Sequence, residues 1–306
     1  MSDISTAGSS GRGYMPDSIE QPKAYTRPTV AVPPGSCDTH CHVFGPYEQF
    51  PLHQPSSYAA PDAPAQRYLQ VLDDMGMERG VLVQPAPYGT DVSAIIDAVA
   101  RRPQSLRGIG VVGETAELPE LQKLASAGIS GLRFVEARDP SGQLFPGSVG
   151  FATVDTLAPL MRQAGLHVQL WGPYDSYAQH LERLADLGLP VVIDHMASLV
   201  IGRGQHDPIF QTVVRLLSQG KLWVKLSVCR VSRQSPGYED ARPFHDALLS
   251  ANPDQVLWGS DWPYVRMGEA APDIGQLVDL AYDWLGDDAT RRKVWVDNPQ
   301  ALYGFA

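Results

Sequence analysis

Two histidines separated by one residue, His40 and His42, lie in a short apolar stretch that also contains Asp38. In an extended strand successive side chains point to opposite faces, with a rise of roughly 3.3 Å per residue, so we expect all three side chains on one face. Two imidazoles about 6.5 Å apart can hold a common metal ion, water molecule or carbonyl oxygen. Gly45 and Pro46 end the stretch, which predicts that His42 lies near the carboxyl end of its strand.

Charged and polar residues also occur in or directly after other apolar stretches. His195 ends the stretch 190–195, and Asp261 directly follows the stretch 255–260. Arg133 interrupts a further apolar stretch, where a buried arginine needs an anionic or carbonyl partner. If these stretches are parallel strands, their carboxyl ends meet at one edge, and the histidines and the aspartate converge on a single site.

The elements that would position these residues alternate along the chain. Apolar stretches predict eight strands, at residues 37–44, 80–84, 106–112, 129–136, 167–171, 190–195, 222–228 and 255–260. Helical spacing predicts helices at about residues 66–77, 92–101, 118–127, 154–164, 177–187, 209–219, 244–251, 276–285 and 289–296. Eight strands, each followed by a helix, predict an α/β fold of the (β/α)8 or TIM barrel class, whose active sites lie where the strands end.

The 306 residues suffice for one such barrel, which needs about 250 residues. Residues 1–35 are rich in Ser, Gly and Pro, so we expect an N-terminal extension that wraps the outside or stays mobile. Residues 36–306 are expected to form the barrel as a single domain. The loop 47–64 is long enough to be a lid or binding loop, and Tyr58 within it and Trp171 at a strand end are expected to line the site.

Composition limits the compartment and the partners. The formal net charge of −10 argues against nucleic acid or an anionic membrane surface as a partner. No apolar run approaches the roughly 20 residues of a membrane span, and no signal-peptide pattern is seen. Three cysteines without paired spacing indicate a cytoplasmic protein. A small anionic ligand is compatible with this charge because local arginines outweigh a distant negative surface. A homo-oligomer is also compatible with the sequence.

The ordered motifs resemble the amidohydrolase superfamily, and within it the branch of 2-pyrone-4,6-dicarboxylate lactonase and muconolactone-type lactone hydrolases. The resemblance runs from about residue 33 to residue 305. It rests on Asp38-Thr39-His40-Cys41-His42-Val43-Phe44-Gly45, Gly89-Thr90-Asp91, Gly131-Leu132-Arg133-Phe134, Ile193-Asp194-His195-Met196, Lys225-Leu226-Ser227, Trp258-Gly259-Ser260-Asp261-Trp262-Pro263 and Asn298-Pro299. It implies a TIM-barrel hydrolase that opens a lactone, a cyclic carboxylic ester, in the degradation of aromatic compounds.

The resemblance bears on whether a metal is involved. Many amidohydrolases hold zinc through His-x-His, a histidine that ends the fifth strand and the aspartate after the eighth. Here the fifth strand begins with His167 and ends in Trp171, so that ligand is missing. The lactonase branch implies chemistry without a metal, and we expect no cofactor. The alternative is a zinc-dependent decarboxylase or hydratase of the same superfamily, with Zn²⁺ held by His40, His42, Asp261 and His195.

The expected reaction is attack of water on a lactone carbonyl. Asp261 is expected to take the proton from the water as the general base. The three histidines His40, His42 and His195 are expected to stabilise the oxyanion in place of a metal.

Three arginines, Arg133, Arg138 and Arg230, are expected to hold carboxylate or sulfonate groups of the substrate. The pyrone lactonase has a small hydroxylated residue after the second strand, whereas this chain has Pro85-Ala86-Pro87. A pyrone dicarboxylate and a sulfonated or plain muconolactone are therefore equally compatible substrates. A barrel that binds an anion without catalysis is the remaining alternative.

Overall fold

The computed structural model describes residues 14–16, 18–53 and 58–305. Residues 1–13 and 17 of the expected N-terminal extension, residues 54–57 of the expected binding loop and residue 306 lie outside the described residues.

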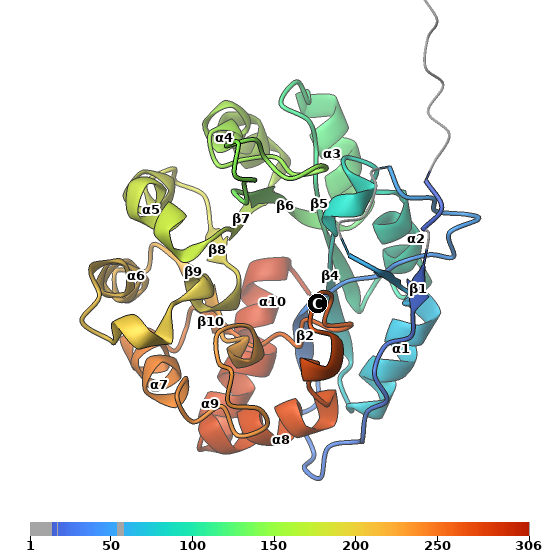
Figure 1. Ribbon diagram of the computed structural model, residues 1–306. Helices are drawn as coiled ribbons and strands as arrows, with labels where there is room; N and C mark the ends of the chain where they lie inside the picture. Colours follow the sequence, from blue (N-terminus) through green and yellow to red (C-terminus); the bar gives the residue numbers. More distant parts are fainter. Residues whose placement is uncertain (1–13, 17, 54–57, 306) are drawn as a thin grey trace, which may run out of the picture.

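Eight parallel strands form one sheet whose order follows the chain, with helices arranged around it (Figure 1). Most positions in these strands are buried, as expected for strands covered by helices on one face and by a core on the other. The (β/α)8 barrel predicted from the alternation is therefore confirmed. The strands are β2 (Cys37–Cys41), β4 (Arg79–Val83), β5 (Leu106–Gly110), β6 (Ile129–Val135), β7 (His167–Trp171), β8 (Val191–Ile193), β9 (Trp223–Lys225) and β10 (Val256–Leu257).

The helices pack their apolar stripes against the outside of the strands. The end of α4 shows how the sequence stops a helix, because Gly165 adopts φ 71°, a left-handed conformation that glycine reaches without strain. The helices are α1 (Ala65–Asp74), α2 (Ser93–Arg101), α3 (Leu118–Ser126), α4 (Thr153–Ala164), α5 (Tyr177–Ala185), α6 (Pro208–Ser218), α7 (Arg242–Ala251), α8 (Ile274–Trp284), α9 (Asp288–Arg292) and α10 (Asn298–Tyr303).

One end of the barrel interior is filled by apolar side chains. Tyr303 and Phe305 at the C-terminus pack against a small inner cluster, which comprises Cys37, Val81, Val83, Ile109, Val192 and Leu257. Cys37 opens β2. This cluster therefore closes the end of the barrel where the strands begin and leaves the opposite end open for a site.

Backbone hydrogen bonds join β2 to the segment that follows β10. The amide of His42 donates to the carbonyl of Trp262 over 2.8 Å, and the amide of Asp261 donates to the carbonyl of His40 over 2.7 Å. Gly259 permits this approach, because a Cβ at that position would lie 2.7 Å from the Cβ of His40. The closure of the barrel thus places Asp261 beside the two histidines of β2.

The described part of the N-terminal extension lies against the outside of the barrel. Within it β1 (Ile19–Glu20) pairs with β3 (Ala60–Pro61) in the long loop. Lys23 donates to the carbonyl of Ala271 over 2.6 Å, and Arg27 pairs with Asp74 of α1. Among the helices of the described ranges, none is both long enough and apolar enough to cross a bilayer.

Candidate active site

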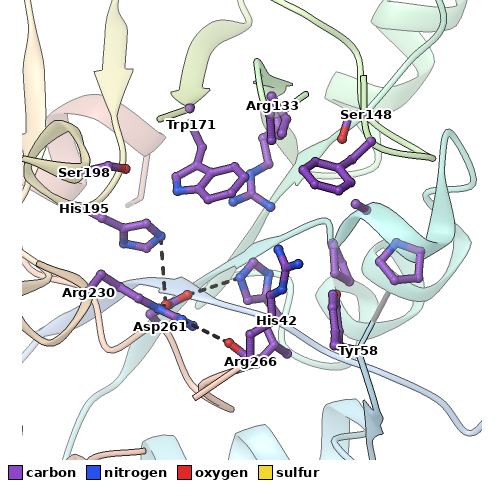
Figure 2. Close-up of a pocket in the computed structure, with 18 of the residues that line it drawn as sticks. His42, Tyr58, Arg133, Ser148, Trp171, His195, Ser198, Arg230, Asp261 and Arg266 are labelled. Atoms are coloured by element: carbon purple, nitrogen blue, oxygen red, sulfur yellow. Dashed lines mark hydrogen bonds and ion pairs between the residues drawn. The ribbon is translucent and has the colours of Figure 1, made fainter. Parts of the chain in front are cut away.

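A pocket of about 360 Å³ opens at the carboxyl ends of the strands. Figure 2 shows its side chains converging from several strands and loops. His40 lies just behind the lining, fully buried, with its ring centre 5.0 Å from that of His42 and 4.7 Å from that of His195. The structure thus brings together most of the residues singled out in the sequence, since the lining includes His42, Tyr58, Arg133, Trp171, His195, Arg230 and Asp261.

Arg138 does not belong to this lining. Its guanidinium pairs with Glu136 at 2.6 Å, and its side chain is 46% exposed. The loop after β6 folds back on itself through a bridge between Arg138 and Leu144, and this path turns the side chain away from the pocket. Arg266, which the sequence patterns do not single out, lines the pocket instead.

The first strand of the barrel does not alternate regularly. The register of β2 against β4 shifts between Asp38 and Cys41, and such a bulge rotates the side chains that follow it. The expectation that Asp38 shares a face with His40 is therefore wrong. Asp38 accepts hydrogen bonds from Tyr68 of α1 over 3.2 Å and from the Ser260 hydroxyl over 2.6 Å. It ties the strand to a helix and to the end of β10, and takes no part in the pocket.

Asp261 is the centre of the polar cluster. Its Oδ1 lies 3.2 Å from Nε2 of His42 and 3.5 Å from Nε2 of His40. Its Oδ2 pairs with Arg230 and lies 3.9 Å from Nε2 of His195 (Figure 2). Burial alone raises the pKa of this carboxyl, but the Arg230 guanidinium and the histidines lower it well below its usual range. Asp261 is therefore ionised in the free protein at neutral pH.

A left-handed turn holds His195 over the pocket. The segment η3 (His195–Ser198) follows β8 and has φ between 50° and 60° at all four residues. Residues other than glycine adopt this conformation at a cost of roughly 1–2 kcal/mol each. Such strain persists only where the surrounding structure imposes it, and it is concentrated at functional sites. Burial lowers the pKa of His195 to about 4, so the ring is neutral at physiological pH.

A second polar cluster lies behind the first, and the sequence motifs included its Lys225 and Asp194 without assigning either a place in the site. Lys225 of β9 is fully buried and lies 3.3 Å from Asp194, 2.9 Å from Gln169 of β7 and 3.2 Å from Nδ1 of His40. Burial raises the pKa of Asp194, but His40, Lys225 and Arg133 lower it well below its usual range. The available signal was the one used for Arg133, namely a polar residue inside an apolar strand.

Arg133 reaches from β6 to the wall of the pocket. Its Nη1 donates to the carbonyl of Gln84 over 3.1 Å, and its Nη2 lies 3.5 Å from Asp194. Its Nε is buried and has no hydrogen-bond partner in the part of the chain that the structure describes. A buried donor without a partner is costly, so this N–H group is suited to donate a hydrogen bond to a ligand oxygen.

Several ligand atoms lie close enough to hold a metal ion. The groups His40–His42–Asp261 and His40–Asp194–His195 each bring one ligand atom per residue within 4.8 Å of the others. Two cations adjoin these groups, because the partly buried Arg230 guanidinium is paired with Asp261 and the fully buried Lys225 ammonium lies 3.2 Å from Nδ1 of His40. A divalent cation here would be repelled by both at short range in a poorly screened interior. These two positive charges disfavour a divalent cation among the ligand atoms of either group.

Comparisons with known proteins agree with this architecture. A family model described as amidohydrolase matches residues 37–305. The chain is 34% identical over 277 residues to 4-sulfomuconolactone hydrolase of Hydrogenophaga intermedia, an alignment that covers 89% of this chain and 90% of that protein. It is 30% identical to 2-pyrone-4,6-dicarboxylate hydrolase of Comamonas testosteroni, with 91% and 93% covered. A solved structure from Acinetobacter baumannii, named "probable 2-pyrone-4,6-dicarboxylic acid hydrolase" and holding citric acid, is 27% identical with a TM-score of 0.74, over 89% of this chain and all of that one (100%).

Proposed function

The chain belongs to the amidohydrolase family, and we propose that it hydrolyses the ring of an anionic lactone in the degradation of aromatic compounds. The observation that carries this proposal is an ionised aspartate, Asp261, among three imidazoles at the base of a pocket whose wall carries guanidinium groups. The relatives named as hydrolases of sulfomuconolactone and pyrone dicarboxylate support the same substrate class, since both names denote anionic lactones.

In the proposed reaction, Asp261 takes a proton from a water molecule, whose oxygen attacks the lactone carbonyl carbon. The carbonyl oxygen becomes an oxyanion, for which the ring nitrogens of His40, His42 and His195 are the nearby hydrogen-bonding groups. Collapse of this intermediate breaks the bond to the ring oxygen, which takes up the proton. One oxyanion donor is typically worth about 2.7–4 kcal/mol of barrier.

Arg230 links substrate binding to the basicity of Asp261. In the free protein it pairs with Asp261 and keeps that carboxylate a weak base. A carboxylate or sulfonate on the substrate competes for the same guanidinium, as charge-assisted hydrogen bonds to arginine favour such groups. Binding of the anion therefore releases the carboxylate to act as a general base at the moment when its water is in place.

Two further side chains extend the binding surface. Ser148 lines the pocket, and its hydroxyl is buried without a partner among the described residues. We propose that it supplies the hydroxyl that is absent from Pro85-Ala86-Pro87. Arg266 lines the outer part of the pocket and adds a third guanidinium beside Arg133 and Arg230.

The proposed chemistry uses no metal, because the charges around Asp261 oppose a divalent cation. The zinc-dependent alternative predicts instead that activity of the purified protein depends on bound zinc. Activity that disappears on dialysis against a strong chelator and returns in proportion to added zinc would establish that alternative.

The direct test is the hydrolysis of a panel of anionic lactones, including 4-sulfomuconolactone and 2-pyrone-4,6-dicarboxylate, followed by proton release. In Asp261→Asn the general base is lost while the shape of the site is kept, so kcat is expected to fall by about 10²- to 10⁴-fold. The matched control is Asp283→Asn on α8, where the side chain is 74% exposed. Retention of a tenth of the wild-type kcat in Asp261→Asn would contradict the base assignment.

A further inference from the structure

Lys225 is a buried cation that the proposed reaction does not use. Its side chain is fully buried, and it is not among the residues that line the pocket. Burial lowers the pKa of the ammonium below its usual value, and the neighbouring Asp194 offsets part of this effect. A buried ammonium costs free energy unless each of its protons has a partner. Here the ammonium donates to Gln169, contacts Nδ1 of His40 and forms an ion pair with Asp194.

The contact with His40 decides where the ring carries its proton. An ammonium group has three donors and no acceptor, so Nδ1 of His40 must accept over the 3.2 Å that separate it from Lys225. The competing arrangement is an Nδ1–H that donates to Oδ1 of Asp194, 3.1 Å away. A proton on Nδ1 would, however, lie against the Lys225 ammonium, which is 3.2 Å from the same nitrogen, whereas a proton on Nε2 faces the Asp261 carboxylate.

We propose that Lys225 is a positioning residue that keeps the ring proton of His40 on Nε2, facing the reacting oxygen. Nε2 of His40 is buried, lacks a hydrogen-bond partner in the described chain and lies 3.5 Å from Oδ1 of Asp261. A proton there makes neutral His40 a hydrogen-bond donor to an oxyanion. The inference rests on the proposed function only in assigning that oxygen to a lactone.

His42 has the opposite arrangement, and the pair is thereby asymmetric. Nδ1 of His42 lies 2.7 Å from the carbonyl oxygen of Val83, which can only accept, so Nδ1 of His42 carries a proton. Without Lys225, His40 would donate from Nδ1 to Asp194 in the same manner. Removal of Lys225 would also remove one of the two positive charges that oppose a divalent cation beside His40, His42 and Asp261.

The test compares wild type, Lys225→Met and Lys225→Gln by two measurements that need no substrate. Long-range ¹H–¹⁵N spectra of the histidine rings, with His40 assigned through His40→Asn, are expected to show Nε2–H in wild type and Nδ1–H in Lys225→Met. Calorimetric titration with zinc chloride is expected to show one site in Lys225→Met that binds at least tenfold more tightly than any site in wild type. Lys225→Gln retains a neutral N–H donor and is expected to keep the wild-type tautomer.

The control is Lys221→Met, which removes an exposed lysine paired with Asp186 and should change neither measurement. In the enzymatic assay, loss of the His40 donor is expected to lower kcat about 10²-fold in Lys225→Met. The inference would be overturned if Nδ1 of His40 carried the proton in wild type. It would also be overturned if Lys225→Met had the same His40 tautomer and the same zinc affinity as wild type. If Lys225→Met does not fold, the spectra of wild type and Lys225→Gln still show which ring nitrogen of His40 carries the proton. If the spectra show the expected tautomers but no lactone is hydrolysed, the proposed function is wrong and the inferred role of Lys225 still holds.

Discussion

The three guanidinium groups of the pocket differ in the partners that they already have within the protein. Arg230 is paired with Asp261, and Arg133 is partly engaged by Asp194 and a backbone carbonyl. Arg266 lies over the rings of Tyr58 and Phe145, with 5.9 Å and 5.8 Å to their centres, and makes no ion pair within the described ranges. Arg266 is therefore the pocket cation with the most capacity left for a substrate anion.

Replacing Arg266 with Met should raise KM for a doubly charged lactone by about 10- to 100-fold, because one charge-assisted hydrogen bond worth about 1.5–3 kcal/mol is lost. The value of kcat should change little, since the expected role of Arg266 is to bind the anion rather than to act on the lactone carbonyl. Steady-state kinetics on doubly and singly charged lactones measure the effect, and the singly charged substrate should be affected less. Arg138→Met serves as the comparison, and an equal or larger rise in KM there would contradict the assignment.

At the scale of elements, the turn η3 performs a task that a regular helix cannot. β8 ends at Ile193, and the pocket lies directly above it. A right-handed helical turn would carry the chain away, whereas four left-handed residues reverse it at once and set His195 within 3.9 Å of Asp261. The backbone strain of this turn is the cost of that placement.

The strain at Ser198, where φ is 53°, can be measured by comparing two small residues. Alanine keeps the left-handed penalty and glycine removes it, so Ser198→Gly should be more stable than Ser198→Ala by up to about 1 kcal/mol. At Ser250, inside α7, the order should reverse, since glycine in a helix is less stable than alanine by about 1 kcal/mol. Urea unfolding of the four variants gives both differences, and the same sign at the two positions would refute the strain.

A looser turn should also affect catalysis. Ser198→Gly frees the backbone beside His195, so kcat should fall relative to Ser198→Ala while the protein becomes more stable. Stability and activity moving in the same direction would show that the conformation of η3 does not serve His195.

At the scale of the whole molecule, the barrel buries ionisable groups of both kinds. His40, His167 and His195 are buried as neutral rings, whereas Asp194 and Asp261 are buried as carboxylates beside cations. Such groups bind protons differently in the folded and unfolded chain, so the stability of the fold depends on pH.

Lowering the pH from 7 to 5 should destabilise the protein. Burial lowers the pKa of His195 to about 4, that of His167 to about 3 and that of His40 well below its usual range. Unfolded histidines titrate near about 6.5, so between these values the unfolded chain binds more protons and the free energy of unfolding decreases as the pH is lowered. Asp38 opposes this loss of stability, because burial raises its pKa to about 6 and the folded state therefore binds the carboxyl proton more readily than the unfolded chain. His245 is also buried with a lowered pKa, so four histidines less Asp38 give a net difference of up to about three protons, or roughly 4 kcal/mol per pH unit.

Urea unfolding at pH 7, 6 and 5 measures this slope. His195→Gln should reduce it by up to one proton, whereas His206→Gln, at an exposed position, should leave it unchanged. A free energy of unfolding that is constant from pH 7 to pH 5 would contradict the burial of three neutral rings.

Much of this protein follows from the sequence alone. Alternation of apolar strands with amphipathic helices is a local pattern, and eight repeats of it have one closed arrangement, so the barrel and its strand order could be predicted. That arrangement brings the carboxyl ends of the strands together. His42, His195 and Asp261 could therefore be assigned to one site although they lie far apart in the chain.

The tertiary structure alone decided which side chains reach that site and in what state. The bulge in β2 depends on how two strands pair, so alternation could not show that Asp38 leaves the face of His40. The loop after β6 turns Arg138 away, and another loop brings in Arg266, because loop paths are set by packing rather than by local propensity. Lys225 meets His40 across 185 residues of sequence. Such a contact exists only once the barrel has closed. The proposed position of the proton on His40 therefore depends on the tertiary structure.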